Sequence, residues 1–142
     1  MNSSARSDLV RELGHLRHHG NSMSMLVMTV RNTSSGLLAG INGDVFSLDY
    51  PIAGWLDFVR TRDFKLFCSQ RGFLTRKVRW GKERVIRAAI GSNVAQAADV
   101  IDACFLAVYG ESGAFGLELR GFGWQPSNNS LESDTAKPRA SG

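Results

Sequence analysis

The residues best suited to chemistry are the basic side chains between Arg60 and Arg87. This stretch of 28 residues contains ten lysines and arginines and only two acids, Asp63 and Glu83. The whole chain has a net charge of +4, so the rest of the chain is acidic on balance. Cations clustered in this way bind anions, such as the phosphates of nucleic acid, an anionic lipid surface or an acidic protein.

Arginine outnumbers lysine in this stretch by seven to three, which favours two-pronged hydrogen bonding to phosphate or carboxylate. Phe73 and Trp80 would add aromatic surfaces on which bases stack. The alternative is a solvated sheet face whose arginines only keep the protein soluble. We predict a site for nucleic acid or another polyanion formed by Arg71, Arg76, Lys77, Arg79, Lys82, Arg84 and Arg87.

Two smaller groups of residues could also do chemistry. Glu12, His15 and His19 have a helical spacing that could offer a metal one carboxylate and two imidazoles. Histidines near a helix C-terminus are also favoured by the helix dipole, and no second ligand cluster is evident, so we predict no metal and no cofactor. Asp44 and Asp49 bracket a short strand, either as a carboxylate pair or as ordinary turn residues.

Motifs of the common enzyme classes are missing from the sequence. It contains no Gly-x-Ser-x-Gly elbow, no phosphate-binding Gly-x-x-x-x-Gly-Lys loop and no Cys-x-x-Cys pair. We therefore lean away from an enzyme, while Asp44 and Asp49 leave that question open. The two cysteines, Cys68 and Cys104, lie within apolar runs, which predicts reduced core residues.

Length and composition predict one domain over residues 7–125. Residues 1–6 and the polar tail at 126–142 are predicted to be disordered. The N-terminus has no apolar leader, and no apolar run approaches the roughly 20 residues of a membrane span. We therefore expect a soluble, cytoplasmic protein that does not insert into a membrane.

Apolar periodicity in the first half of the chain predicts a helix followed by three strands. Ser7 is the expected N-cap of the helix, and Gly20 is the expected stop. The asparagine and glycine at 42–43 predict a tight turn between the last two strands, which makes a three-stranded antiparallel meander. The predicted strands are Met23–Val30, Leu37–Ile41 and Asp44–Leu48.

A second helix is predicted to begin at Pro51, because apolar residues then recur with the helical period. The pattern at 61–70 fits either a helix or a strand, and Gly72 ends it in both cases. Residues 73–90 then form a hairpin that turns at Gly81-Lys82. Lys77 and Arg79 alternate with Val78 and Trp80, so the basic side chains are expected on one face and the apolar ones on the other.

The last predicted helix begins after Ser92 or Asn93 and ends before Gly110. Its apolar stripe is expected to pack onto Val78 and Ile86 of the sheet. The stripe consists of Val94, Ala97, Ala98, Ile101, Phe105 and Val108. An alternating segment at 115–124 predicts a final strand that lies at an edge or contains a bulge.

These elements predict an α+β two-layer sandwich, with a mainly antiparallel sheet of about five or six strands and helices on one face. The predicted function is a small non-catalytic binding module that engages nucleic acid or another polyanionic surface through residues 60–87. The alternative is an adaptor or chaperone-like module that binds an acidic protein. The element order resembles that of small bacterial secretion chaperones, but those proteins are acidic, and we assign no family. The oligomeric state stays open.

Overall fold

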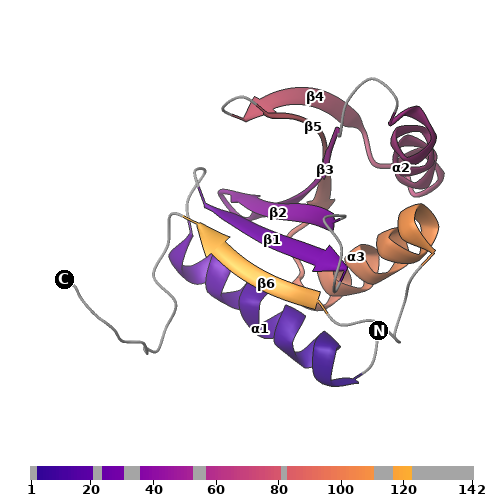
Figure 1. Ribbon diagram of the computed structural model, residues 1–142. Helices are drawn as coiled ribbons and strands as arrows, with labels where there is room; N and C mark the ends of the chain where they lie inside the picture. Colours follow the sequence, from indigo (N-terminus) through magenta and orange to yellow (C-terminus); the bar gives the residue numbers. More distant parts are fainter. Residues whose placement is uncertain are drawn as a thin grey trace.

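A computed structural model of the chain describes residues 3–20, 24–30, 36–52, 57–80, 83–110 and 117–122. These residues form one sheet in the order β4-β5-β3-β2-β1-β6, in which every pair of neighbours is antiparallel. The predicted α+β fold is confirmed (Figure 1). The elements are α1 (Ser3–His19), β1 (Met25–Val30), β2 (Gly36–Asn42), β3 (Val45–Pro51), α2 (Phe58–Gln70), β4 (Thr75–Trp80), β5 (Glu83–Gly91), α3 (Val94–Tyr109) and β6 (Leu117–Phe122).

Strands β1, β2 and β3 form the predicted meander, but its second turn lies one residue later than expected, at Gly43-Asp44. This register pairs Ile41 with Phe46, and both side chains are buried in the core. The predicted turn would have placed the Asp44 carboxylate opposite Ile41. Gly43 adopts a φ of 64°, a conformation that favours glycine.

Strands β4 and β5 form the predicted hairpin. Trp80 pairs with Glu83, so the connecting loop is at residues 81–82, outside the described residues. Strand β5 also pairs with β3, where the register shifts between Phe46 and Ser47. The hairpin is thereby attached to the meander, and β4 is an edge strand of the sheet.

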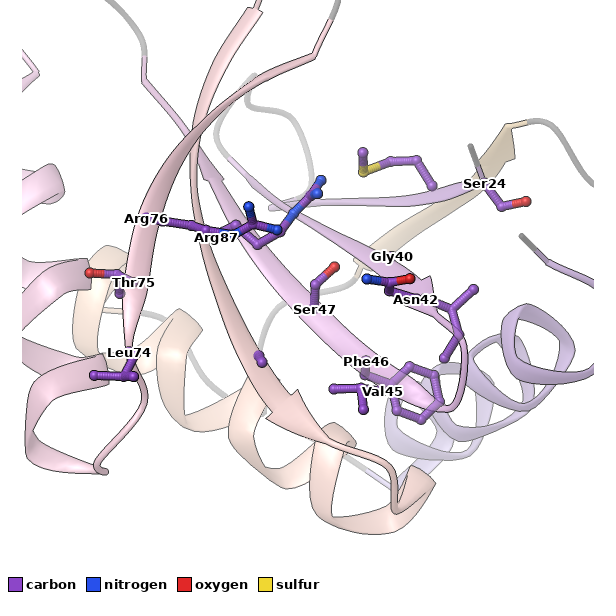
Figure 2. A pocket seen from close by; sticks show the side chains of 13 residues that line it. Ser24, Gly40, Asn42, Val45, Phe46, Ser47, Leu74, Thr75, Arg76 and Arg87 are labelled. Atoms are coloured by element: carbon purple, nitrogen blue, oxygen red, sulfur yellow. The ribbon is translucent and has the colours of Figure 1, made fainter. Parts of the chain in front are cut away.

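The sheet is strongly curved, with β4 and β5 folded back on the side away from α1 and α3 (Figure 1). The face without helices is therefore concave. Arg76 and Arg87 are cross-strand partners on this concave face and extend over the sheet (Figure 2). The opposite, convex face carries the helices and the core.

The core lies between the convex face of the sheet and the helices. One buried cross-strand row contains Leu26, Ala39, Leu48 and Ala88, which are in register across four strands. The predicted packing of α3 against the sheet is confirmed for Ile86, which belongs to this core. It is wrong for Val78. Lys77 is the cross-strand partner of Ile86 and shares its face, so the next residue, Val78, points to the concave face.

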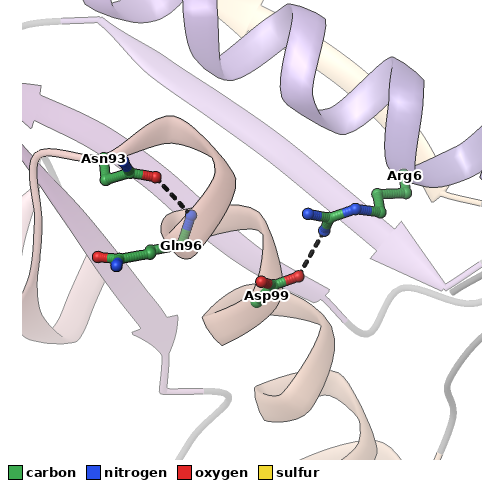
Figure 3. A network of polar contacts seen from close by, with 4 residues as sticks. All are labelled: Arg6, Asn93, Gln96 and Asp99. Atoms are coloured by element: carbon green, nitrogen blue, oxygen red, sulfur yellow. Dashed lines mark hydrogen bonds and ion pairs between the residues drawn. The ribbon is translucent and has the colours of Figure 1, made fainter.

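Helix α1 covers β1 and β2, with Leu9, Leu13 and Leu16 fully buried as their spacing predicts. It begins at Ser3, so Ser7 is an interior residue rather than the N-cap, and residues 3–6 are helical. Arg6 forms an ion pair with Asp99 of α3, which holds this first turn against its neighbour (Figure 3).

Helix α2 begins at Phe58 rather than at Pro51, because Pro51 is the last residue of β3 and pairs with Val85. Residues 53–56 lie outside the described residues. The ambiguous segment at 61–70 is helical. Its buried residues include Phe64, whose ring stacks on that of Tyr50 at a centroid distance of 5.6 Å.

Helix α3 has the predicted boundaries. Asn93 is its N-cap, and the Asn93 side chain accepts a hydrogen bond of 2.9 Å from the backbone N–H of Gln96 (Figure 3). Gly110 follows the helix with a φ of 71°. Cys104 of α3 and Cys68 of α2 are buried free thiols, as expected.

None of the described helices is long and apolar enough to cross a membrane. The predicted polar tail at 126–142 lies outside the described residues, as do the ends of the segment predicted as the final strand. The part of that strand that is described, Leu117–Phe122, pairs with β1 at the edge of the sheet.

Candidate polyanion-binding surface

The β4–β5 hairpin divides the predicted basic site between its two faces. Antiparallel partners share a face of the sheet. Arg79 is the partner of Arg84, and Lys77 lies on the same face because it is two residues from Arg79. Arg76 is the partner of Arg87 and lies on the opposite face. The five predicted residues that the structure describes on this hairpin therefore do not form one continuous patch.

Lys77, Arg79 and Arg84 form a group on the convex face that we call the cationic triplet. All three side chains are exposed, and none forms an ion pair with another described residue. Figure 1 shows the end of the β4–β5 hairpin extending away from the helices. The predicted alternation of Lys77 and Arg79 with the residues between them is confirmed.

Arg87 is occupied by Asp49 of β3. Its Nε donates to Oδ1 at 2.9 Å and its Nη2 donates to Oδ2 at 2.8 Å, which makes a two-pronged ion pair. The Asp49 side chain is fully buried. Burial raises the pKa of this carboxyl, and Arg87 opposes that rise. Asp49 is thus a structural partner of Arg87, whereas Asp44 is exposed in its turn.

Arg76 lies beside this ion pair on the concave face. Its side chain is exposed and forms no ion pair with a described residue. Arg76, Arg87 and Asp49 together carry two positive charges and one negative charge. The group therefore leaves one net positive charge on the concave face.

Three other basic residues of the cluster have partners on or beside α2. The guanidinium of Arg71 lies 4.9 Å from the centre of the Phe67 ring, and that of Arg60 lies 4.9 Å from the centre of the Tyr109 ring. Arg62 contacts Asp63 at 3.4 Å. These contacts tie basic side chains to the fold and separate them from the cationic triplet.

The two aromatic residues predicted near the site do not make a described stacking surface. Phe73 is half-buried against the core, so its ring is not a free platform for bases. The side chain of Trp80 and the whole of Lys82 fall outside what the structure describes. Among the side chains that the structure describes, the triplet offers positive charge and no aromatic ring.

Glu12, His15 and His19 all lie on α1. Glu12 contacts His15 at 4.0 Å, and the ring centres of His15 and His19 are 6.3 Å apart. Among the described residues, no group of three His, Cys, Asp or Glu side chains is placed to hold a metal ion.

The outer face of α2 is an apolar surface that sequence reasoning missed. Phe58 is 66% exposed and Leu66 is 52% exposed, with Arg62 and Lys65 between them. The sequence predicts a helix from Pro51 by the recurrence of Ile52, Trp55, Leu56 and Val59, and Phe58 is not part of that pattern.

No family model, curated protein or solved structure matches this chain.

Proposed function

We propose that this protein is a non-catalytic binding module that holds nucleic acid, or another polyanion, on the cationic triplet. One observation carries the proposal: Arg79 stands directly opposite Arg84 on the hairpin, both side chains are exposed, and neither forms an ion pair with a side chain that the structure describes. Like charges directly opposite each other destabilise a sheet. A phosphate between the two guanidinium groups relieves this repulsion.

The triplet suits a chain of phosphates better than a single anion. Cross-strand partners have Cβ atoms about 5 Å apart, within which two guanidinium groups can share one phosphate. Lys77 lies about 7 Å from Arg79 along the strand and reaches a second phosphate. Such contacts read charge and spacing rather than base sequence, so we expect binding with little sequence preference.

The test is fluorescence anisotropy with a labelled single-stranded oligonucleotide. Each neutralised phosphate releases condensed counterion, so three contacts give a log–log salt slope of about −2. Affinity should therefore fall about 15-fold between ~50 and ~200 mM salt. Changing the triplet by Lys77→Glu, Arg79→Glu and Arg84→Glu should abolish binding while the far-ultraviolet circular dichroism stays unchanged.

A matched variant controls for net charge. Arg11→Glu, Arg62→Glu and Lys65→Glu reverse the same number of exposed cations on α1 and α2. This control should retain most of the binding, because none of its residues belongs to the triplet. No binding by the wild type at ~50 mM salt, or an equal loss in both variants, overturns the proposal.

A second candidate function rests on the outer face of α2. Exposed Phe58 and Leu66, with Arg62 and Lys65 between them, form an apolar surface crossed by positive charge. Exposed apolar patches edged with charge mark protein-binding sites. This surface favours the adaptor function, with an acidic amphipathic segment of another protein as the partner.

The two candidate functions are separable by mutation. A pull-down from cell extract should lose its protein partner with the variant Phe58→Ser and Leu66→Ser but keep it with the triplet variant. Leu106→Ser, at an exposed position of α3, is the matched control. A partner that is retained by the Phe58 and Leu66 variant argues against the adaptor function.

A further inference from the structure

The concave face of the sheet contains a cavity of about 480 Å³ that no function discussed above uses (Figure 2). Its walls come from five consecutive strands of the sheet, β1 to β5, and from Leu74 just before β4. The volume lies within the range of about 300–1,000 Å³ that is typical of small-molecule sites. The cavity is on the face opposite the cationic triplet, so the two sites are independent.

The floor of the cavity is low because small residues are aligned across three strands. Gly40 pairs with Ser47, and Ser47 pairs with Ala89. A Cβ atom at Gly40 would approach the Ser47 hydroxyl to 2.9 Å, so this position accepts glycine and little else without movement of Ser47. Larger side chains in this row would fill the hollow.

One wall of the cavity carries positive charge. Arg76 and Arg87 both line it and extend side by side over the sheet (Figure 2). The Arg87 groups that bond Asp49 are Nε and Nη2, and its Nη1 group donates to neither Asp49 oxygen. Arg76 and the Nη1 group of Arg87 therefore supply donors for an anion. Together with Asp49, the two arginines carry one net positive charge, which matches a single negative charge on the ligand.

The rest of the lining is mixed, because apolar side chains from Met25 to Leu74 stand among the polar residues Asn42, Ser47 and Thr75. Leu74 is 91% exposed and Val45 is 41% exposed, and both line the mouth. Met25 lies deeper and is almost fully buried. Large apolar side chains at the mouth of a cavity favour an apolar molecule that covers them.

We propose that this cavity binds a small amphipathic monocarboxylate. The carboxylate accepts hydrogen bonds from Arg76 and from the Nη1 group of Arg87, and the apolar part lies along the row of small residues toward Leu74 and Val45. A single carboxylate matches the net charge of the wall, and its planar oxygens match the planar guanidinium donors.

The test is isothermal titration of the whole chain with decanoate and, in parallel, with decanol at the same concentrations. Decanoate should bind more tightly than decanol, because only decanoate carries the carboxylate. Arg76→Gln should weaken decanoate binding about 10-fold to 100-fold and leave decanol binding unchanged. The matched control is Arg11→Gln, which removes an exposed arginine of α1, on the helix side of the sheet, and should change neither affinity.

A second variant tests the position of the apolar part. The Ala89 side chain is exposed on the concave face, so Ala89→Phe should fill the cavity and prevent binding of both ligands. No decanoate binding by the wild type overturns the proposal, and so does equal binding of decanoate and decanol. Decanoate affinity that is unchanged in Arg76→Gln also overturns it, whatever the result with oligonucleotides.

Discussion

Arg87 of β5 and Asp49 of β3 are joined by two parallel hydrogen bonds, although 38 positions separate them in the chain. The Asp49 side chain is fully buried and that of Arg87 is 22% exposed. The pair links the hairpin to the meander on the concave face. Arg76 lies on the same face, and it forms no ion pair with a described residue.

Removing Arg87 alone should destabilise the protein strongly. Arg87→Met leaves a buried carboxylate without its partner, which costs about 3–5 kcal/mol of unfolding free energy in urea. The apolar double variant, Asp49→Leu with Arg87→Met, should recover much of that loss. The pair would not be structural if Arg87→Met cost no more than Arg79→Gln, a change at an exposed position of β4.

The Arg87→Met variant should also show a specific pH dependence. Burial raises the pKa of Asp49 above its ordinary value of 3.8, and Arg87 opposes that rise more than Arg76 does. In Arg87→Met the larger opposing contribution is lost. A native-state pKa above the unfolded one gives stability that is present below pH ~4 and is lost as the pH rises through the native pKa. Urea unfolding from pH 3 upward should therefore show a deficit that grows with pH. A constant deficit contradicts this cause.

Within the cationic triplet, stability and binding should change in opposite directions. Arg84→Glu converts the cross-strand pair with Arg79 from repulsive to attractive, which should add about 0.2–1 kcal/mol to the unfolding free energy. The same change should weaken oligonucleotide binding. The two measurements are urea unfolding and anisotropy at one salt concentration. If Arg84→Glu lowers the stability and leaves the oligonucleotide affinity unchanged, the pair of Arg79 and Arg84 does not bind the oligonucleotide.

The core stripe of α3 can be tested at Ile101, which is fully buried. Ile101→Ala should lower the unfolding free energy by about 2–5 kcal/mol, because it removes buried methylene groups and leaves a cavity. Leu106→Ala on the same helix is the control, because Leu106 is 54% exposed. A loss below about 1 kcal/mol at Ile101 would contradict the packing of α3 described here.

The N-cap of α3 is testable at Asn93. Asn93→Ala removes the acceptor of the Gln96 backbone N–H and should cost about 1 kcal/mol. Gln96→Ala is a matched control, because it changes the side chain and keeps the backbone donor. Thermal unfolding of the two variants should therefore differ. If both melt at the wild-type temperature, the cap contributes nothing.

The two buried thiols should make the protein less stable at alkaline pH. Burial raises the pKa of Cys68 from an ordinary value of 9.0 to about 11 and raises that of Cys104 further. Above pH 9 the thiols ionise in the unfolded chain before they ionise in the native one, so stability falls as the pH rises toward 11. In urea unfolding, the slope between pH 9 and 11 should be shallower for Cys68→Ala with Cys104→Ala. An unchanged slope would exclude the thiols as its cause.

Features encoded by neighbouring residues were correctly predicted. The boundaries of α3 follow from Asn93 before it and Gly110 after it. The β4–β5 hairpin follows from its period-two pattern and from the glycine and lysine at 81–82 in the sequence. Each of these signals acts over a few residues, so the sequence reveals it without knowledge of the rest of the chain.

The predicted starts of α1 and α2 are wrong because contacts with distant parts of the chain outweigh the local signals there. Pro51 suits the first turn of a helix, but in this protein it ends β3, where pairing with Val85 extends the strand. Ser7 is a good N-cap, yet the helix continues back to Ser3, and the ion pair of Arg6 with Asp99 supports the added turn. The deciding partners in both cases are distant in sequence.

The sequence by itself determined the α+β class, the antiparallel hairpins and the concentration of positive charge in residues 60–87, because periodicity, turns and composition are local properties. Only the tertiary structure decided how that charge is divided. Strand pairing placed Asp49 against Arg87, separated Arg76 from the cationic triplet and aligned Gly40, Ser47 and Ala89 beneath a cavity. Pairing between distant strands depends on packing of the whole chain, and no short window of sequence contains it.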